Sequence, residues 1–504
     1  MLTDYFKMLK RIILNLLVIL SLTACKREFF GESGPGELQF STDTIIFDTV
    51  FTSVGSTTHT LKVYNRNNNS VTINSIDLAN INSEGVYRIN VDGTSGTHAE
   101  NIKIAAYDSI YIFVEATINP VVGSNLPYLV IDSLLFVTNG KTQNVDLVAY
   151  GQNANFYTPH DNFFMSGTDT VNYKYHSITE NTTWNNTLPH VIYGYVIVEK
   201  NEFGEKPTLT IEPGCQIYFH KNSGIIVGNP LLADNGGTLL VGNPNGNPEP
   251  ENPVIFQGDR LDSWYEDLAG QWDRIWFTPG SVNNKINNAI IRNGTVGLHA
   301  DTIGNNNPTL TVKNTIIENM SDIGIFAQGS HVVGENNVIS DCGRYAMVLN
   351  IGGTYDFKHS TFANYWSFSS RNTPSILLKN FYEDANGNIQ LRDLQQASFT
   401  NCIISGSLPG EIELQENTTA TFNYSFNNCL LKLHPDSSLA SLNENNSIKI
   451  QNSDSLFVDI QEDNYQLHQL SPAIDSGVDA GISLDILGNT RNGLPDLGAY
   501  EKVD

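Results

Sequence analysis

A short pattern of polar and apolar positions recurs through the second half of the chain. It begins with Asn or His, continues with a small residue, two mostly apolar residues and any residue, and often ends at Asn, Asp or Gly. Start-to-start spacings are 26, 22, 23, 42 and 27 residues. Four of them match one coil of a parallel β-helix, and the spacing of 42 indicates an insertion or an extra coil. The copies start at Asn288, Asn314, Asn336, His359, Asn401 and Asn428.

Strand alternation decides which side chains of each copy point inward. The fourth position is always large and apolar, and the second is always short. Because successive side chains of a strand point to opposite faces, these two positions share the inner face and the third lies outside. Stacking coils ~4.8 Å apart places like residues over like residues. The pattern therefore predicts an apolar inner column, and a ladder of side-chain amides where the Asn residues stack. No coil can bury its inner face alone, so the array depends on contacts between neighbours.

Cys402 and Cys429 occupy the same inward position on consecutive copies of the pattern. A separation of ~4.8 Å falls within the Cα range of a disulfide. Two stacked small apolar side chains fit the position as well, since free cysteine is commonly buried. We expect the free thiols, and the disulfide stays the alternative.

A different pattern fills the region before the repeats. From about residue 38 to residue 150, short β-branched and aromatic runs are separated by turn clusters such as 65–69. About seven strands in roughly 110 residues are typical of an immunoglobulin-like sandwich. We expect this sandwich over residues 38–152, followed by an ordered connector over 153–188.

Three stretches carry a resemblance to known families. Residues 47–66 resemble the opening of bacterial immunoglobulin-like modules of the abnormal-spindle type, which bind or space and do not catalyse. The strand–turn units of 207–258 resemble the opening coils of right-handed parallel β-helix proteins of the pectate-lyase-like superfamily. Residues 470–501, with the motifs Leu-Ser-Pro-Ala-Ile-Asp-Ser-Gly and Pro-Asp-Leu-Gly-Ala-Tyr-Glu, resemble the choice-of-anchor Q module of bacterial surface proteins.

These resemblances imply the fold class and the boundaries of the remaining domains. The chain is expected to be all-β, with the sandwich followed by a right-handed parallel β-helix over residues 189–470 and a closing segment over 471–504. Most members of the choice-of-anchor Q group lack an assigned reaction, so the resemblance implies architecture and not chemistry.

The first 25 residues predict where in the cell the protein is located. A short basic region, with Lys10 and Arg11, precedes an apolar run over 12–22 that is too short to span a bilayer comfortably. It ends in Leu-Thr-Ala-Cys25, which resembles the bacterial lipobox. The resemblance implies a signal peptide over 1–24, an acylated Cys25 and a tether over 25–37. Several acyl chains hold a protein stably on a membrane, so we expect a surface-exposed lipoprotein of the outer membrane; a soluble secreted protein is the alternative.

Charge narrows the choice of partners. The chain has 504 residues, with 53 Asp and Glu against 28 Lys and Arg, and a formal net charge of −25. A non-specific grip on nucleic acid needs clustered Lys and Arg, so we expect no nucleic-acid partner. Repulsion between like charges also makes a polyuronate ligand less favourable unless calcium bridges it.

Two excursions from the repeat carry the candidate binding residues. Residues 257–276 and 364–394 interrupt the coil pattern with aromatic, acidic and Arg residues. Aromatic faces stack on sugar rings, and charged groups bond to their hydroxyls. An equally good interpretation of the first excursion is a loop that packs on the solenoid through Trp272 and Trp276. The predicted ligand-binding residues are Asp259, Arg260, Trp264, Tyr265, Trp272, Asp273, Arg274, Tyr365 and Trp366.

The sequence contains no recognisable catalytic cluster. Residues 190–470 hold no tight Asp pair on a strand and no EF-hand-like loop, and they lack a nucleophile elbow, an HExxH pair and a phosphate loop. We therefore expect a non-catalytic platform that binds glycans or outer-envelope proteins without a cofactor. The alternative is a polysaccharide lyase, with calcium, or a glycoside hydrolase acting in the β-helix groove. Two carboxylates roughly 5–9 Å apart on neighbouring coils would favour the hydrolase.

Overall fold

The computed structural model describes residues 37–79, 83, 85–166, 170–232, 234–281, 283–301, 308–384, 386–434, 442–452 and 455–503. The predicted signal peptide and the acylated Cys25 lie outside these residues. The chain divides into two compact units, Met1–Asn153 and Ala154–Asp504. Apart from the 3-10 turn η1 (Ser263–Tyr265), the described residues form strands, turns and loops. No described helix is long and apolar enough to cross a membrane.

The first unit consists of two five-stranded sheets. Its strands alternate between buried and exposed positions, as in β4, because each sheet turns one face to the core. Phe47, Leu61, Ile112 and Phe136, from both sheets, are fully buried in that single core. The first sheet has the order β1 (Gln39–Phe40), β3 (His59–Tyr64), β8 (Ser109–Ala116), β5 (Tyr87–Val91) and β6 (Thr94–Gly96). The second has the order β2 (Thr44–Phe51), β10 (Lys141–Gln152), β9 (Tyr128–Thr138), β4 (Val71–Leu78) and β7 (His98–Ile104), with β2 parallel to β10.

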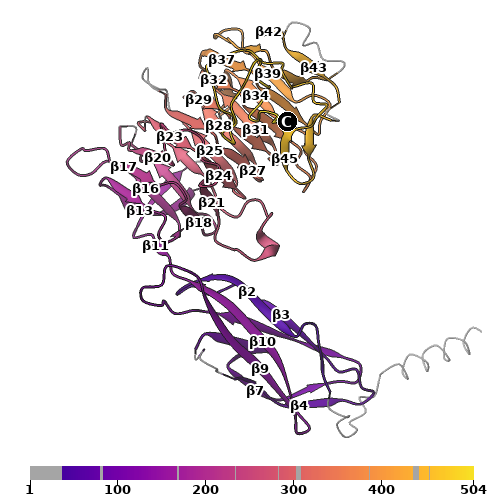
Figure 1. The fold of residues 1–504 in the computed structure, drawn as a ribbon. Coiled ribbons are helices and arrows are strands. Elements are labelled where there is room, and N and C mark those ends of the chain that lie inside the picture. Colours follow the sequence, from indigo (N-terminus) through magenta and orange to yellow (C-terminus); the bar gives the residue numbers. More distant parts are fainter. Residues whose placement is uncertain are drawn as a thin grey trace, which may run out of the picture. The chain divides into compact units, whose positions relative to one another are not determined.

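The second unit is built from three long sheets, S1, S2 and S3, whose strands the chain visits in turn (Figure 1). S1 contains β11 (Asn155–Tyr157), β15 (His190–Ile192), β18 (Gln216–Phe219), β21 (Val254–Gly258), β24 (Ala289–Arg292), β27 (Ile316–Glu318), β30 (Val338–Ser340), β33 (Thr361–Asn364), β38 (Ile403–Gly406), β41 (Leu430–Lys432) and β43 (Ile448–Ile450). S2 contains β12 (Asp161–Ser166), β13 (Thr170–Ile178), β16 (Tyr195–Val198), β19 (Gly224–Val227), β22 (Ile275–Phe277), β25 (Val296–Ala300), β28 (Ile323–Gln328), β31 (Tyr345–Asn350), β34 (Ile376–Lys379) and β39 (Ile412–Gln415). S3 contains β14 (Thr182–Trp184), β17 (Thr208–Ile211), β20 (Thr238–Val241), β23 (Asn284–Asn287), β26 (Leu310–Lys313), β29 (His331–Glu335), β32 (Gly353–Lys358), β37 (Leu394–Thr400), β40 (Ser425–Asn427) and β42 (Glu444–Asn445).

All strand pairs within these sheets are parallel except β12 with β13. This topology is consistent with the predicted solenoid. The predicted start of the parallel sheets at residue 189 is too late. Residues 153–188, expected as a connector, already supply the strands β11, β12, β13 and β14 of these sheets.

The register of S1 confirms the predicted stacking of like over like. Ile291 pairs with Ile317, and Ile317 pairs with Ile339. Across the spacing of 42, Phe362 pairs directly with Ile404, so that spacing is an insertion within one coil. The insertion contains the antiparallel hairpin of β35 (Phe381–Glu383) and β36 (Ile389–Leu391). The fourth-position side chains, Ile291, Ile317, Ile339, Phe362, Ile404 and Leu431, are fully buried in one core.

The first residue of each copy turns the chain with a left-handed backbone. The φ angles at these positions lie between 46° and 60° in all six copies, a region that Asn and other short polar residues tolerate best among non-glycine residues. The amide ladder also forms: Asn336 Nδ2 donates to Asn314 Oδ1 at 3.1 Å, and Asn401 Nδ2 lies 2.9 Å from His359 Nε2. The backbone requirement is a reason for Asn that the sequence pattern alone does not reveal.

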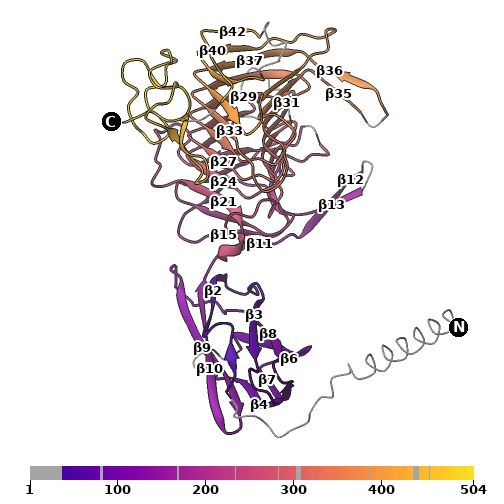
Figure 2. The ribbon, with the colours of Figure 1, turned by 90° about the vertical axis from the view of Figure 1, so that its right-hand side faces the viewer.

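Residues 457–503, which include the hairpin of β44 (Phe457–Asp459) and β45 (Asn464–Leu467), lie along the outer face of S1 (Figure 2). Outward side chains of S1, such as Ile403 and Leu430, are fully buried in a second core with this segment. Asn336 Nδ2 donates to the Leu484 carbonyl at 2.7 Å, and the Ala499 N–H donates to Thr361 Oγ1 at 3.0 Å. The segment therefore covers the flank of several coils.

The four described cysteines, Cys215, Cys342, Cys402 and Cys429, are free and buried. The Sγ atoms of Cys402 and Cys429 lie 3.5 Å and 3.4 Å from the carbonyls of Phe357 and Phe399. Burial raises the pKa of Cys402 well above its ordinary value. The inward pair therefore packs as two free thiols in the apolar core.

Candidate functional site

A cavity of about 620 Å³ opens beside the first coils of S2. We call it the tyrosine–arginine pocket. Its walls come from β13, from the turn that leads into β16, from the turn before β19, and from the end of the excursion 257–276. The lining side chains used below are Tyr173, Lys174, Tyr193, Tyr195, Lys221, Asp273 and Arg274.

A glycine places the two turn tyrosines of this pocket. Gly194 has φ of +74°, and a Cβ there would lie 2.4 Å from the Lys174 carbonyl oxygen. Only glycine combines this backbone with so close an approach. As a result Tyr193 and Tyr195 both line the cavity, on either side of a tight turn. Asp273 is fixed by its own backbone, because its N–H donates to the Ser223 carbonyl at 2.8 Å.

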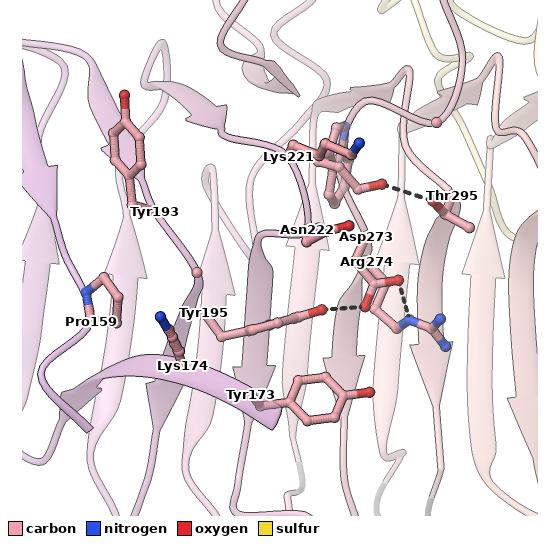
Figure 3. A pocket seen from close by; sticks show the side chains of 13 residues that line it. Pro159, Tyr173, Lys174, Tyr193, Tyr195, Lys221, Asn222, Asp273, Arg274 and Thr295 are labelled. Atoms are coloured by element: carbon pink, nitrogen blue, oxygen red, sulfur yellow. Dashed lines mark hydrogen bonds and ion pairs between the residues drawn. The ribbon is translucent and has the colours of Figure 1, made fainter. Parts of the chain in front are cut away.

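Hydrogen bonds connect the polar groups of the pocket. Tyr195 donates its hydroxyl proton to Asp273 Oδ2 at 2.7 Å, and Arg274 Nε donates to Asp273 Oδ1 at 2.9 Å (Figure 3). Arg274 Nη1 lies 3.3 Å from His299 Nδ1. Burial, assisted by the Arg274 charge, lowers the pKa of His299 to about 3, so this ring is neutral and accepts from the guanidinium.

Burial and the neighbouring Asp273 raise the pKa of Tyr195 far above its ordinary value. The tyrosine is therefore a fixed neutral donor. The pocket as a whole is a preformed set of hydrogen-bonding groups beside aromatic rings. Arrangements of this kind bind polar ligands that have apolar faces.

The predicted residues of the first excursion separate into two groups. Asp273 and Arg274 line the pocket. Trp272 also borders it, but its ring is 1% exposed, stacks on Phe219 at 4.3 Å and donates Nε1–H to the Arg292 carbonyl at 2.8 Å. This geometry matches the alternative interpretation, in which Trp272 anchors the loop.

The remaining residues of that excursion lie outside the pocket lining. Asp259 contacts His220, with 2.8 Å between Oδ2 and Nδ1. Arg260 donates to the Tyr265 hydroxyl at 2.6 Å and lies over its ring. Trp264 is 80% exposed.

The second excursion does not reach this pocket. Tyr365 stacks on Tyr465 of the C-terminal segment with ring centroids 6.1 Å apart. Trp366 donates Nε1–H to Ser369 Oγ at 2.9 Å and packs beside Phe368. Sequence reasoning missed Tyr173, Lys174, Tyr195 and Lys221; the pair of tyrosines around Gly194 is the local signal that could have found one of them.

A second cavity, of about 190 Å³, lies at the border between the exposed and covered parts of the outer face of S1. We call it the carboxyl cleft. Tyr365 and Phe368 form part of its wall, together with Arg292. Its acidic side chains are Glu266, Asp267, Glu318, Asp341 and Asp463.

Two carboxyl groups of the cleft come from neighbouring coils. Glu318 of β27 pairs with Ser340 of β30, and Asp341 follows directly. Burial raises the pKa of Glu318 to about 7 against the attraction of Arg292, and burial likewise raises the pKa of Asp341 to about 7 although Tyr465 donates to it at 2.5 Å. Carboxyl groups with pKa values near neutrality can donate or accept a proton at physiological pH. Within the described residues, no group of three or more His, Cys, Asp and Glu side chains is arranged to hold a metal ion.

Comparisons with known proteins find no matching family model. No curated protein matches the chain either. It is similar to a family 123 glycoside hydrolase from Clostridium perfringens, with 10% identity, a TM-score of 0.18, and coverage of 23% of this chain and 27% of the hydrolase. It is also similar to the E. coli chaperone DraB, with 9% identity, a TM-score of 0.17, and coverage of 23% of this chain and 54% of the chaperone. The chain therefore spans less than two thirds of the length of either protein. The catalytic domain of a GH87 α-1,3-glucanase is similar with 11% identity, a TM-score of 0.22, and coverage of 87% of this chain and 91% of the glucanase domain. TM-scores this low support no assignment.

Proposed function

We propose that the protein is a lipid-anchored protein of the bacterial outer membrane that binds glycans without catalysis, and that the tyrosine–arginine pocket is its binding site. The observation that carries the proposal is the pairing of aromatic rings with preset donors in one open cavity of about 620 Å³. Sugar rings present apolar C–H faces to aromatic side chains and hydroxyl groups to charged ones. Tyr173 and Tyr193 supply partly exposed rings, and Arg274 supplies the donor.

The rest of the chain suits a rigid platform that presents this pocket. A solenoid whose coils share one core is stiff along its length. We assign residues 189–470 to a right-handed parallel β-helix, and residues 471–504 to a choice-of-anchor Q module. The two sheets of the first unit, with β2 parallel to β10 at one edge, support an immunoglobulin-like spacer over 38–152. Cys25 would carry the acyl chains, and a protein partner in the outer envelope is compatible with the same platform.

A glycan array tests the binding function. The full-length lipoprotein, solubilised in detergent, is applied to the array beside its Arg274→Ala variant. The matched control is Arg88→Ala, because Arg88 is an exposed arginine of the first unit whose ion pair with Glu115 is 65% and 33% exposed. We expect binding by the wild type and the control, and its loss in Arg274→Ala at unchanged melting temperature. Binding that survives in Arg274→Ala would place the ligand elsewhere, and an array without any bound glycan would refute the function.

The carboxyl cleft favours a second candidate function, a glycoside hydrolase. Hydrolysis needs an acid that protonates the leaving oxygen and a carboxylate that acts on the opposite face of the sugar. Glu318 and Asp341, on neighbouring coils and with pKa values near 7, could share these roles. Release of reducing ends from a polysaccharide, abolished in both Glu318→Gln and Asp341→Asn, would support the hydrolase. Release that persists in both variants would refute it.

A further inference from the structure

We infer that the tyrosine–arginine pocket selects glycans that carry an anionic group, either a carboxylate or a sulfate ester; this inference rests on the glycan-binding function proposed above. The pocket lining contains three cationic side chains, Lys174, Lys221 and Arg274, and one carboxylate, Asp273. The formal charge of the lining is therefore 3 − 1 = +2. The whole chain has a net charge of −25, so the pocket is opposite in sign to the molecule around it.

The single carboxylate of the pocket is already engaged. Asp273 Oδ1 accepts from Arg274 Nε, and Asp273 Oδ2 accepts from the Tyr195 hydroxyl. Its charge is thus directed at one edge of the guanidinium. Arg274 Nη1 contacts the neutral His299, and Nη2 has no partner among the described residues. An anion can therefore approach the guanidinium without displacing Asp273.

The two lysines of the pocket are also available. Within the described part of the chain, neither Lys174 nor Lys221 forms an ion pair, whereas Lys200, Lys313 and Lys449 each contact a carboxylate within 3.0 Å. Lys174, in β13, and Lys221, after β18, are exposed side chains from different coils, and both border the same cavity. Two ammonium groups without a carboxylate partner among the described residues thus border one cavity, in a chain that has almost twice as many acidic as basic residues.

Electrostatics explains why such a cluster would be needed. A strongly acidic protein repels anionic ligands unless a local group of cations reverses the potential at the site. A guanidinium also matches the planar oxygen pairs of a carboxylate or sulfate. The same chemistry predicts that binding weakens as salt screens the charges. A neutral glycan would gain nothing from Lys174 and Lys221 beyond ordinary hydrogen bonds.

The test uses an array on which each neutral oligosaccharide is accompanied by its uronate and its sulfated counterparts. The full-length wild type is compared with the double variant Lys174→Ala/Lys221→Ala, with the charge-preserving Lys174→Arg/Lys221→Arg, and with the control Lys502→Ala, an exposed lysine outside the pocket lining. We expect at least one anionic series to bind about 10-fold more tightly than its neutral counterpart, the effect of one hydrogen bond to a charged group. That preference should disappear in the alanine double variant, persist in the arginine variant and the control, and shrink at high salt.

Each outcome decides a separate point. Equal binding of neutral and anionic glycans overturns the anion selectivity and leaves the proposed glycan-binding function intact. Absence of any bound glycan overturns the proposed function itself. A preference that survives in the alanine double variant also overturns the inference, because the lysines would then not create it. The uronate and sulfate series show which anion the pocket prefers.

Discussion

Replacement of Arg371 by Ala should unfold the loop of residues 365–375, between β33 and β34, at a large cost in stability. Arg371 and Glu411 are buried, with side-chain exposures of 1% and 0%. Arg371 Nη1 and Nη2 donate to the two oxygens of Glu411 at 2.9 Å and 2.7 Å. The same carboxylate accepts from the Ser375 N–H at 2.7 Å and from the Leu408 N–H at 2.6 Å. The pair therefore ties the loop of residues 365–375 to the next coil.

The expected loss in the free energy of unfolding follows from the buried charge that remains on Glu411. Removing one partner of a buried ion pair leaves the other uncompensated and typically costs about 3–5 kcal/mol. Here the two N–H donors still hold Glu411, so we expect about 3 kcal/mol for Arg371→Ala. In Arg371→Met/Glu411→Leu no buried charge is left, and the loss should be clearly smaller than the sum of the two single changes.

Urea unfolding of the second unit, followed by tryptophan fluorescence, measures these differences; the described tryptophans Trp184, Trp264, Trp272, Trp276 and Trp366 all lie in that unit. The matched control is Arg344→Ala, which breaks a contact with Asp322 in which Arg344 is 58% exposed and should cost less than about 1 kcal/mol. Equal losses in Arg371→Ala and Arg344→Ala would refute the reasoning. Because Tyr365 and Phe368 border the carboxyl cleft, any activity at that cleft should fall in Arg371→Ala.

Three further predictions concern the two cavities. Trp272→Ala should destabilise the second unit by about 3–5 kcal/mol, as for a buried aromatic residue, while Arg274→Ala leaves the urea midpoint unchanged; an unchanged midpoint in Trp272→Ala would contradict its role as an anchor. Asp273→Asn should strengthen the binding of anionic glycans about 3-fold, because it removes the one carboxylate of the pocket lining; weaker binding in a titration would show that Arg274 needs Asp273 to orient it. The folded pKa of Glu318, about 7, lies above its ordinary value of 4.5, so its contribution to stability is present below pH 4.5 and is lost as the pH rises through 7. Glu318→Gln should flatten this part of the pH profile of urea unfolding relative to the exposed control Glu202→Gln, and equal slopes would argue against a buried carboxyl.

The long parallel sheets of the second unit were predictable because their packing demands a regular sequence. Each coil must bury one large apolar residue over the last, so Ile317 and Ile339 recur at the coil period and pair in the structure. The covering of the outer face of S1 by the C-terminal segment was harder to predict. Ile403 and Leu430 occupy outward positions and are nonetheless apolar. That mismatch indicates a covering segment, but it does not say which part of the chain supplies it.

The pocket was only half predictable for a geometric reason. Asp273 and Arg274 stand in a visible excursion, whereas Lys174 and Tyr195 reach them only through the stacking of coils that are far apart in sequence. Trp272 shows a second limit. A tryptophan beside Arg and Asp suits a sugar site and a packed loop equally, and the choice depends on Phe219 and the Arg292 carbonyl, which the sequence does not place beside it.

The packing of residues 457–503 against S1 has a consequence for folding during synthesis. Bonds such as Asn336 to Leu484 and Ala499 to Thr361 join partners 148 and 138 residues apart, so they form only after the later partner has been synthesised. Until then Ile403 and Leu430 present an apolar stripe, which is the kind of surface that chaperones and proteases recognise in unfinished chains. Truncated copies would thus be open to degradation, and only chains that contain this segment would bury the stripe and persist.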